Sequence, residues 1–196
     1  MTDLETNQLP EEPTAPDADK KPGKVKKPFW REVLEWVVTI VAAVAIAFVV
    51  RTFLFEPVRV DGNSMYGTLL NGEIMLVTKP EYLLGDPERF DVVICHYPNR
   101  GNTNFVKRVV GLPGDTVAVK DGYLYVNGEK YAEDYLVNRP NYSLADYVVP
   151  EGMYFVLGDN RSNSNDSHLI GPITRDMIKG HVRHVVFPFS GWRAVE

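Results

Sequence analysis

The hydrophobic pattern of the chain changes character near residue 55. In residues 36–50, fifteen positions in a row, Thr39 is the only polar side chain. From residue 56 onward the apolar residues occur in short groups separated by glycine, proline, asparagine and aspartate. A long apolar run is typical of a helix in a membrane, whereas short groups between turn residues are typical of β-strands. The pattern therefore predicts one apolar helix followed by a mostly-β domain.

The apolar segment is long enough to cross a bilayer once its flanks are included. Residues 33–55 are interrupted by charge only at Glu35 and Arg51, which lie 16 residues apart. That spacing is about 24 Å along a helix, against a hydrocarbon core about 30 Å thick. We therefore expect Arg51 to reach to one interface and Glu35 to lie near the opposite headgroups. The alternative is a buried core helix, for which a domain of short strands has no room.

The same segment has the order of a cleavable secretory signal, in which bases precede an apolar run and a small-residue cleavage site. The candidate cleavage sites, at residues 43–47, lie inside the apolar run rather than after it. The polar leader of about 30 residues is also longer than usual. We therefore predict an uncleaved signal anchor. Six bases in residues 20–31 predict a cytoplasmic N-terminus, with residues 56–196 outside the membrane.

Charge divides the chain further. Residues 1–19 contain six acids, no base and three prolines, which predicts disorder. The expected organisation is a cytoplasmic tail over residues 1–29, a transmembrane anchor over 30–55 and an extracytoplasmic domain over 56–196. That domain holds 14 bases and 18 acids without a basic run, so no nucleic-acid partner is expected.

The outer domain is expected to be a β-barrel or sandwich with few short helices. Asp-Gly and Asn-Gly pairs at residues 121–122 and 127–128 predict hairpins. Residues 173–180 predict a short helix with Thr174 as its cap and Gly180 as its stop. Residues 132–150 are expected to be an irregular polar excursion. Seven segments rich in β-branched and aromatic residues predict strands: 73–79, 91–97, 104–111, 116–120, 123–128, 153–158 and 181–187.

Ser64 stands in the turn-rich stretch VDGNSMYGTLL, residues 60–70, and is either an ordinary turn residue or a nucleophile. Gly62 and Asn63 permit positive φ, which helps a turn direct backbone N–H groups at an oxyanion. A nucleophilic serine needs a base, and none of the four histidines has a distinctive setting. His181 and His184 are three apart in a strand-like run, which argues against a shared metal site.

Lys107 is the other candidate base, in FVKRVVGLPGD, residues 105–115. Alternation places it on one strand face with Phe105 and Val109. A lysine with its usual pKa is only about 0.04% neutral at pH 7, and lowering that pKa by about three units costs about 4 kcal/mol. Burial among apolar groups achieves this and lets the amine accept a serine proton. The alternative is a lysine whose stem covers a half-buried strand while its amine reaches water.

Two further features bear on the site. The stretch LGDNRSNSNDSHLIGP, residues 157–172, is either a polar surface loop or a support for a catalytic pair. Cys95, the single cysteine, lies in an apolar run and is expected to be a small core residue, so the outer domain has no internal disulfide.

Together these stretches resemble the type I signal peptidases, the membrane-bound serine proteases that remove leader peptides from exported proteins. The resemblance covers residues 30–190 and is closest to the Gram-positive type. The family pattern Lys-Arg-x-x-Gly-x-Pro-Gly-Asp is matched in full by residues 107–115. Ser-Met-x-Pro-Thr-Leu is matched by Ser64, Met65, Thr68 and Leu69. Gly-Asp-Asn-Arg-x-x-Ser-x-Asp-Ser-Arg is matched at Gly158, Asp159, Asn160, Arg161, Ser164, Asp166 and Ser167.

The resemblance implies a serine–lysine dyad that needs no cofactor or metal. Ser64 is then the nucleophile, and its own N–H serves the oxyanion hole. Some family members add a serine hydroxyl two residues earlier, but Gly62 stands at that position here. Lys107 is the general base and later the general acid. The same resemblance assigns four supporting residues: Ser164 to position the amine, Asp166 to support its loop, and Arg108 with Asp159 as a structural ion pair.

The resemblance also implies the surroundings of the enzyme. Its substrates are signal peptides of secreted preproteins, and it is a single-pass type II protein of the cell membrane, beside the secretion translocon. Small substrate side chains fit shallow pockets, and residues 58–62 are expected to pair with the substrate by strand addition. Residues 53–55 and the run VVFPF, residues 185–189, either touch lipid or belong to the core.

Three positions depart from the family pattern. Gly67 replaces a proline and is expected to loosen the turn after the nucleophile. Phe90 replaces a glycine, and His168 replaces an arginine with a group that titrates near neutrality. Two rival interpretations follow. One is a catalytically idle relative that acts as a pilin or assembly chaperone. The other is a self-cleaving repressor domain, which shares the dyad but whose DNA-binding segment is absent here.

Overall fold

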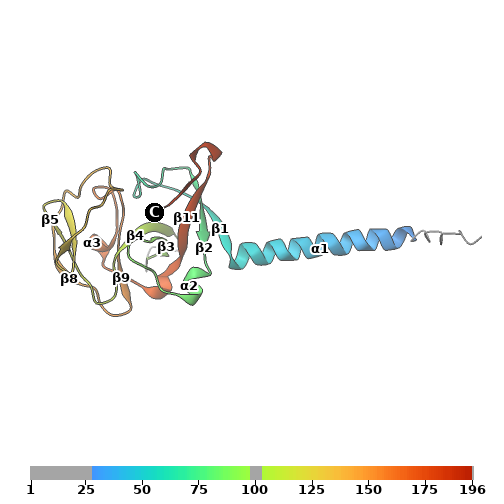
Figure 1. Cartoon of the computed structure of the whole chain (residues 1–196), viewed down its shortest axis with the longest axis horizontal. Helices are drawn as coiled ribbons and strands as arrows, with labels where there is room; N and C mark the ends of the chain where they lie inside the picture. The colour runs from blue at the N-terminus through green and yellow to red at the C-terminus, as the bar shows by residue number, and fades with distance from the viewer. Residues whose placement is uncertain (1–27, 98–102, 196) are drawn as a thin grey trace, which may run out of the picture. The chain divides into compact units, whose positions relative to one another are not determined.

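The structure is a computed structural model that describes residues 28–97 and 103–195 (Figure 1). The predicted disordered tail and most of the basic cluster, residues 1–27, lie outside the described residues. The expected placement of the Arg51 side chain lies outside them too, because the side chains of residues 51–53 are not described.

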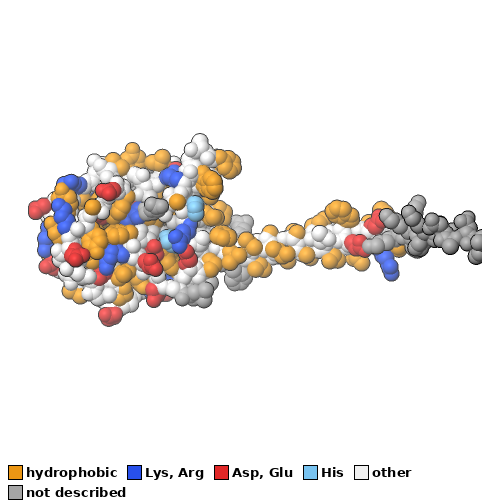
Figure 2. Space-filling view, in the orientation of Figure 1, with side chains coloured by type: hydrophobic (Ala, Val, Ile, Leu, Met, Phe, Trp, Pro, Cys, Tyr) orange, Lys and Arg blue, Asp and Glu red, His pale blue; other side chains and the backbone are white. Residues whose placement is uncertain are grey.

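The helix α1 (Phe29–Phe53) forms from the apolar segment. Its 25 residues extend about 37 Å at 1.5 Å per residue, which exceeds the hydrocarbon thickness of about 30 Å. Hydrophobic side chains cover most of its length, and charged ones gather at its N-terminal end (Figure 2). Residues 29–50 are long and apolar enough to cross a membrane, and they are not buried. This exposure argues against the alternative of a core helix.

The described outer domain contains two sheets, which confirms the mostly-β prediction (Figure 1). The larger has the strand order β1-β2-β11-β3-β4-β9-β10, with β12 on β11, and the smaller has the order β7-β6-β5-β8. The strands of the larger sheet are β1 (Phe55–Arg59), β2 (Ile74–Thr78), β3 (Val92–His96), β4 (Asn104–Gly111), β9 (Met153–Leu157), β10 (Ile173–Thr174), β11 (Ile178–Phe187) and β12 (Arg193–Ala194). Those of the smaller sheet are β5 (Thr116–Lys120), β6 (Tyr123–Val126), β7 (Glu129–Lys130) and β8 (Leu144–Val148).

All seven predicted strands are present, and both predicted hairpins form. The first hairpin joins β5 to β6, and the second joins β6 to β7. All four residues of the two turns have positive φ, which suits the right-handed twist of the flanking strands. Four short helices complete the described domain: α2 (Glu81–Leu84), α3 (Ser167–Ile170), η1 (Arg175–Met177) and η2 (Phe189–Gly191).

The helix predicted for residues 173–180 is wrong. Ile173 and Thr174 pair with β9, a 3₁₀ turn follows, and Ile178 begins β11. Gly180 lies within β11 and does not end a helix. It permits β2 to approach closely, because a Cβ at this position would lie 2.6 Å from Val77 Cγ1. Strand pairing with distant segments overrides the local helical pattern.

The prediction that residues 132–150 are irregular is wrong in part. Residues 132–143 contain no helix or strand, but Leu144–Val148 forms β8 and pairs with β5. The pairing leaves three of its five residues exposed, so no run of apolar residues marks the strand in the sequence.

The core holds in place the turn of residues 60–70, called the nucleophile turn here after the prediction made for Ser64. Met65 and Leu69, from the turn after β1, are buried with Met75 of β2 and Val185 of β11 in one cluster. A separate cluster joins β4 and β9 to the smaller sheet. Because the two apolar side chains flank Ser64 and Thr68, their burial determines which way the polar residues of the turn face.

Candidate active site

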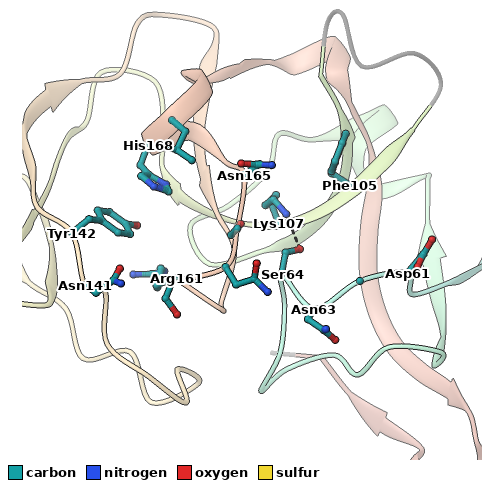
Figure 3. Close-up of a pocket in the computed structure, with 15 residues that line it drawn as sticks. Asp61, Asn63, Ser64, Phe105, Lys107, Asn141, Tyr142, Arg161, Asn165 and His168 are labelled. Atoms are coloured by element: carbon teal, nitrogen blue, oxygen red, sulfur yellow. Dashed lines mark hydrogen bonds between the residues drawn. The ribbon is translucent and has the colours of Figure 1, made fainter.

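The three motifs meet at one cleft in the outer domain (Figure 3). Its volume is about 500 Å³, and it is lined by the turn after β1, by β4 and by the loop after β9. Ser64, Lys107, Ser164 and His168 all face it. The lining is dominated by hydroxyl, amide and charged groups, and Asn141 and Tyr142 from the irregular segment close one side.

Ser64 and Lys107 are hydrogen bonded across 2.8 Å, between Oγ and Nζ (Figure 3). The amine also donates to the carbonyl of Val106 at 3.0 Å. Lys107 is only 1% exposed, which excludes the alternative of an amine that reaches water. The serine therefore has a buried amine within proton-transfer distance.

Burial lowers the pKa of Lys107, because the charged ammonium loses its hydration. The nearby carboxylates of Asp166 and Asp159 oppose this effect. Each of these carboxylates has a basic partner of its own, Asp159 in Arg108 and Asp166 in His168. Burial also raises the pKa of the Cys95 thiol to about 12, so the thiol stays uncharged beside the lysine. Cys95 is fully buried, as expected of a core residue.

Arg108 and Asp159 form the ion pair that the resemblance implied. Arg108 donates through Nε to Oδ1 at 3.0 Å and through a terminal nitrogen to Oδ2 at 2.8 Å. Both side chains are fully buried. Thr68 donates to the same carboxylate at 2.5 Å, and the guanidinium lies 3.9 Å from the ring centroid of Tyr135. The pair thus ties β4 and the loop after β9 to the nucleophile turn.

Asp166 is buried and caps α3 by accepting from the backbone N–H of His168. Its other oxygen accepts from the backbone N–H of Gly158 at 2.8 Å. Ser164 lies against Gly158, and its Oγ is buried without a hydrogen-bond partner in the described part of the chain. The structure therefore brings Ser164 to the cleft but shows no hydrogen bond from it to the Lys107 amine.

Gly67 has a conformation that explains the missing proline. Its φ is +107°, far from the φ of about −65° that a proline ring imposes. A Cβ at this position would lie 2.8 Å from Val137 Cγ2 and 3.1 Å from the carbonyl oxygen of Tyr135. The glycine therefore allows the nucleophile turn to approach the irregular segment closely, a role that the sequence did not indicate.

Phe90 has a φ of +75°, which is unusual for a bulky side chain and explains why glycine suits this position. The conformation is held by two hydrogen bonds: its N–H donates to Val109, and its carbonyl accepts from Arg108 at 2.9 Å. Its ring packs against Tyr131 and Tyr135.

His168, which stands where the family pattern has arginine, contacts Asp166. Its Nδ1 lies 2.5 Å from Asp166 Oδ1, and its ring stacks on Tyr142 with centroids 4.1 Å apart (Figure 3). The imidazole thus joins the carboxylate of Asp166 to the ring of Tyr142, in residues 132–143.

Asn160 and Arg161 are among the residues of the third motif to which sequence reasoning assigned no role. Asn160 is hydrogen bonded to the nucleophile turn, and Arg161 forms a buried ion pair with Glu133 of the irregular segment. Their membership of the Gly-Asp-Asn-Arg match was the only available signal.

A second cleft, of about 210 Å³, adjoins the first at Ser64. Its walls are more apolar and come from Val58 of β1, Val60 and Met65 after β1, and Phe105 of β4. β1 is an edge strand that pairs only with β2 in the described sheet. Backbone hydrogen-bonding groups therefore border this apolar cleft.

The described residues contain no group of three His, Cys, Asp or Glu side chains that could hold a metal ion. His181 instead contacts Glu81 at 2.9 Å and stacks on Tyr82, away from Ser64.

Comparisons with known proteins place these features in a family. The profile of the family described as signal peptidase, peptidase S26, matches residues 33–187. Signal peptidase I from Bacillus amyloliquefaciens is 39% identical over 189 residues, which cover 91% of this chain and 95% of that protein. Signal peptidase I T from Bacillus subtilis (strain 168) is 43% identical over 171 residues, 82% of this chain and 88% of that protein. A crystal structure of a signal peptidase I from Enterococcus faecalis V583 is 37% identical, with a TM-score of 0.43, and the match covers 50% of this chain and 97% of that chain.

Proposed function

Because the chain belongs to the S26 signal peptidase family, we propose that it is a membrane-anchored serine endopeptidase that removes N-terminal signal peptides from exported preproteins. Ser64 is the nucleophile and Lys107 the general base. The observation that carries this assignment is the 2.8 Å hydrogen bond between Ser64 Oγ and the amine of Lys107, which is buried and whose pKa is lowered by that burial. A neutral amine at that distance can accept the hydroxyl proton.

The geometry supports a two-step acyl transfer. Neutral Lys107 takes the proton of Ser64 as Oγ attacks the scissile carbonyl, and the resulting oxyanion accepts a hydrogen bond from the Ser64 N–H. The lysine then returns the proton to the departing amine, which becomes the new N-terminus of the mature protein. Water, activated by the same amine, hydrolyses the ester and restores the serine.

The apolar cleft is suited to the residues before the scissile bond. Val58, Val60 and Phe105 leave about 210 Å³ beside Ser64, enough for small side chains. β4 pairs with β9 only from Arg108 onward, so residues 104–107 have no strand partner on that side in the described structure. A substrate strand between this edge and residues 58–62 can gain backbone hydrogen bonds on both sides.

Four residues act around the dyad. Arg108 and Asp159 hold the nucleophile turn against β4, and Asp166 holds the loop that carries Ser164. Ser164 Oγ, which is buried at the cleft and has no hydrogen-bond partner among the described residues, is available to orient the amine when the lysine side chain moves during catalysis.

The anchor implies a location. With the bases of residues 20–31 on the cytoplasmic side, the domain that follows α1 lies outside the membrane, on the side where a signal peptide ends its apolar segment. The protein then acts beside the secretion translocon, on the lipid bilayer that holds both enzyme and substrate.

The test uses purified full-length protein in detergent with an exported precursor. Wild type is expected to release the mature protein, and both Ser64→Ala and Lys107→Ala are expected to abolish cleavage while the protein stays folded, as checked by circular dichroism. Cleavage that survives either substitution contradicts the dyad. A wild-type protein that binds precursors but never cleaves them supports the chaperone alternative instead.

A further inference from the structure

Asn160 makes two hydrogen bonds to consecutive residues of the nucleophile turn. Its side-chain Nδ2 donates to the carbonyl of Asn63 at 3.0 Å, and its backbone N–H donates to the carbonyl of Ser64 at 2.9 Å. The amide orientation is consistent with a third contact, in which Ser162 Oγ donates to Asn160 Oδ1 at 3.4 Å. The side chain therefore presents its donor, rather than its acceptor, to the turn.

The first of these bonds determines where the Ser64 N–H points. The carbonyl of Asn63 and the N–H of Ser64 belong to one planar trans peptide, so the two groups point in opposite directions. Holding the carbonyl from the side of Asn160 therefore directs the N–H away from Asn160. No protein acceptor takes this N–H in the described structure, so it is free to meet an oxyanion.

The second bond holds the next peptide of the turn. The Ser64 N–H belongs to the peptide between Asn63 and Ser64, and the Ser64 carbonyl belongs to the next peptide. Asn160 is therefore hydrogen bonded to both of these adjacent peptides. Gly158 also lies close, since a Cβ there would be 2.6 Å from the Ser64 carbonyl oxygen. The peptides on either side of the nucleophile cannot rotate without breaking these contacts.

We propose that Asn160 is a positioning residue that aligns the Ser64 N–H for the transition-state oxyanion. The inference rests on the proposed acyl-transfer function. Gly62 offers no side-chain hydroxyl as a second donor, and its N–H is taken by Asn71 Oδ1 at 2.9 Å. Stabilisation of the oxyanion thus depends heavily on one N–H, which makes the orientation of its peptide important.

Within the turn, the Tyr66 N–H also donates to the Asn63 carbonyl at 3.1 Å, and Asn160 holds the same carbonyl from outside the turn. Lys107 and the Arg108–Asp159 pair hold side chains of the turn, at Ser64 Oγ and Thr68 Oγ1, and no bond from them reaches the Asn63 carbonyl. In the described part of the chain, no hydrogen bond joins the Asn160 side chain to Lys107, and Asn160 is only partly buried. Its removal is therefore expected to leave both the base and the core intact.

The test compares Asn160→Ala with the matched control Asn138→Ala, an exposed asparagine outside the cleft. Both full-length variants and wild type are assayed in detergent with a precursor peptide, over a range of pH. Binding is measured for a peptide aldehyde with the same sequence, whose carbonyl adds Ser64 Oγ and one proton to form a hemiacetal in the oxyanion site. Binding is also measured for the released signal peptide, which lacks this tetrahedral centre.

Loss of a single oxyanion donor typically lowers kcat by about 100- to 1000-fold, and misalignment is expected to lower it by about 10- to 100-fold. The proposal predicts this loss for Asn160→Ala, with a matching loss of aldehyde affinity. KM, signal-peptide affinity, the pH profile and the melting temperature should stay at the control values. The unchanged pH profile distinguishes alignment of the N–H from a defect in Lys107.

Two results overturn the proposal. One is a kcat equal to that of Asn138→Ala. The other is an equal loss of affinity for the aldehyde and for the signal peptide, which indicates general disruption of the cleft. Failure of the proposed function is separate, because it appears as inactive wild type or as activity that persists in Ser64→Ala.

Discussion

Restoring the family proline at Gly67 is expected to damage the protein rather than improve it. At its φ of +107°, Gly67 adopts a conformation that a proline ring cannot reach. Gly67→Pro must therefore rebuild the turn that carries Ser64 and Thr68. Gly67→Ala is the milder probe, because alanine can adopt positive φ at a cost and adds only one carbon.

The cost of Gly67→Ala has two parts. Left-handed backbone costs an L-residue about 1–2 kcal/mol, and reduced freedom of the unfolded chain returns about 0.4–1 kcal/mol. The added Cβ also lies 2.8 Å from Val137 Cγ2 and 3.1 Å from the Tyr135 carbonyl oxygen, which is overpacking worth about 1–3 kcal/mol. The Val137 side chain is 56% exposed and can move aside, so we take the lower end of that range. The expected total is about 2 kcal/mol.

Gly62→Ala separates the two parts. Gly62 has nearly the same φ, +103°, but nothing lies within 4 Å of a Cβ there. It is expected to lose only about 1 kcal/mol, the backbone part alone. The double variant Gly67→Ala with Val137→Ala should recover most of the difference.

The assay is thermal unfolding of the full chain in detergent, followed by circular dichroism of the sheets. At about 2–4 °C per kcal/mol, Gly67→Ala should melt about 4–8 °C below wild type and Gly62→Ala about 2–4 °C below. Gly67→Pro should melt lowest and lose most of its activity. A Gly67→Pro variant as stable as wild type would falsify the account, since the turn would then tolerate negative φ.

Three further predictions concern the dyad, the ion pair and the lipid contact. Because burial lowers the pKa of Lys107 in the folded protein below its value in the unfolded chain, the stability of wild type should rise with pH between those two pKa values. The inactive variant Lys107→Met should lack this rise and should be more stable than wild type at pH 7. Melting curves measured across pH test both expectations. Arg108→Ala should cost about 3–5 kcal/mol in denaturant unfolding, because it strands the buried carboxylate of Asp159, and Arg108→Met with Asp159→Leu should cost less. Phe189 and Trp192 are strongly exposed and suited to contact with lipid. The double variant Phe189→Ser with Trp192→Ser should then slow the cleavage of a precursor in vesicles but leave the cleavage of a soluble peptide unchanged. Equal slowing of both reactions contradicts lipid contact.

The sequence predicted those elements whose signals are local. Hairpins at residues 121–122 and 127–128 follow from turn chemistry that acts within four residues. Residues 173–180 were misassigned because the deciding contacts, of Ile173 with β9 and of Gly180 with β2, come from distant parts of the chain. The spacing of apolar residues within one segment, whether helical or strand-like, does not reveal such contacts with distant segments.

The candidate site shows the same limit at the level of side chains. The alternation of side-chain direction along β4 predicted that Lys107 lies between apolar neighbours, but it did not predict whether the amine is buried or reaches water. Only packing against the turn after β1 decides between these outcomes, and it buries the amine against Ser64. The conformations of Gly67 and Phe90 were inaccessible for a related reason, because positive φ at each is maintained by contacts with other segments.

The spacing of the motifs follows from how they hold the nucleophile turn. Ser64 and Thr68 are four residues apart in a turn in which the N–H groups of Thr68 and Leu69 donate to the Met65 carbonyl. Adjacent residues of β4 contact them, Lys107 at Ser64 and Arg108 at Thr68. Adjacent residues of the loop after β9 contact the same two places from the other side: Asn160 at Ser64 and Asp159 at Thr68. Each dipeptide thus combines one contact at the reacting serine with one that anchors the turn. A one-residue insertion between the members of either dipeptide should therefore abolish activity while leaving the residue types unchanged.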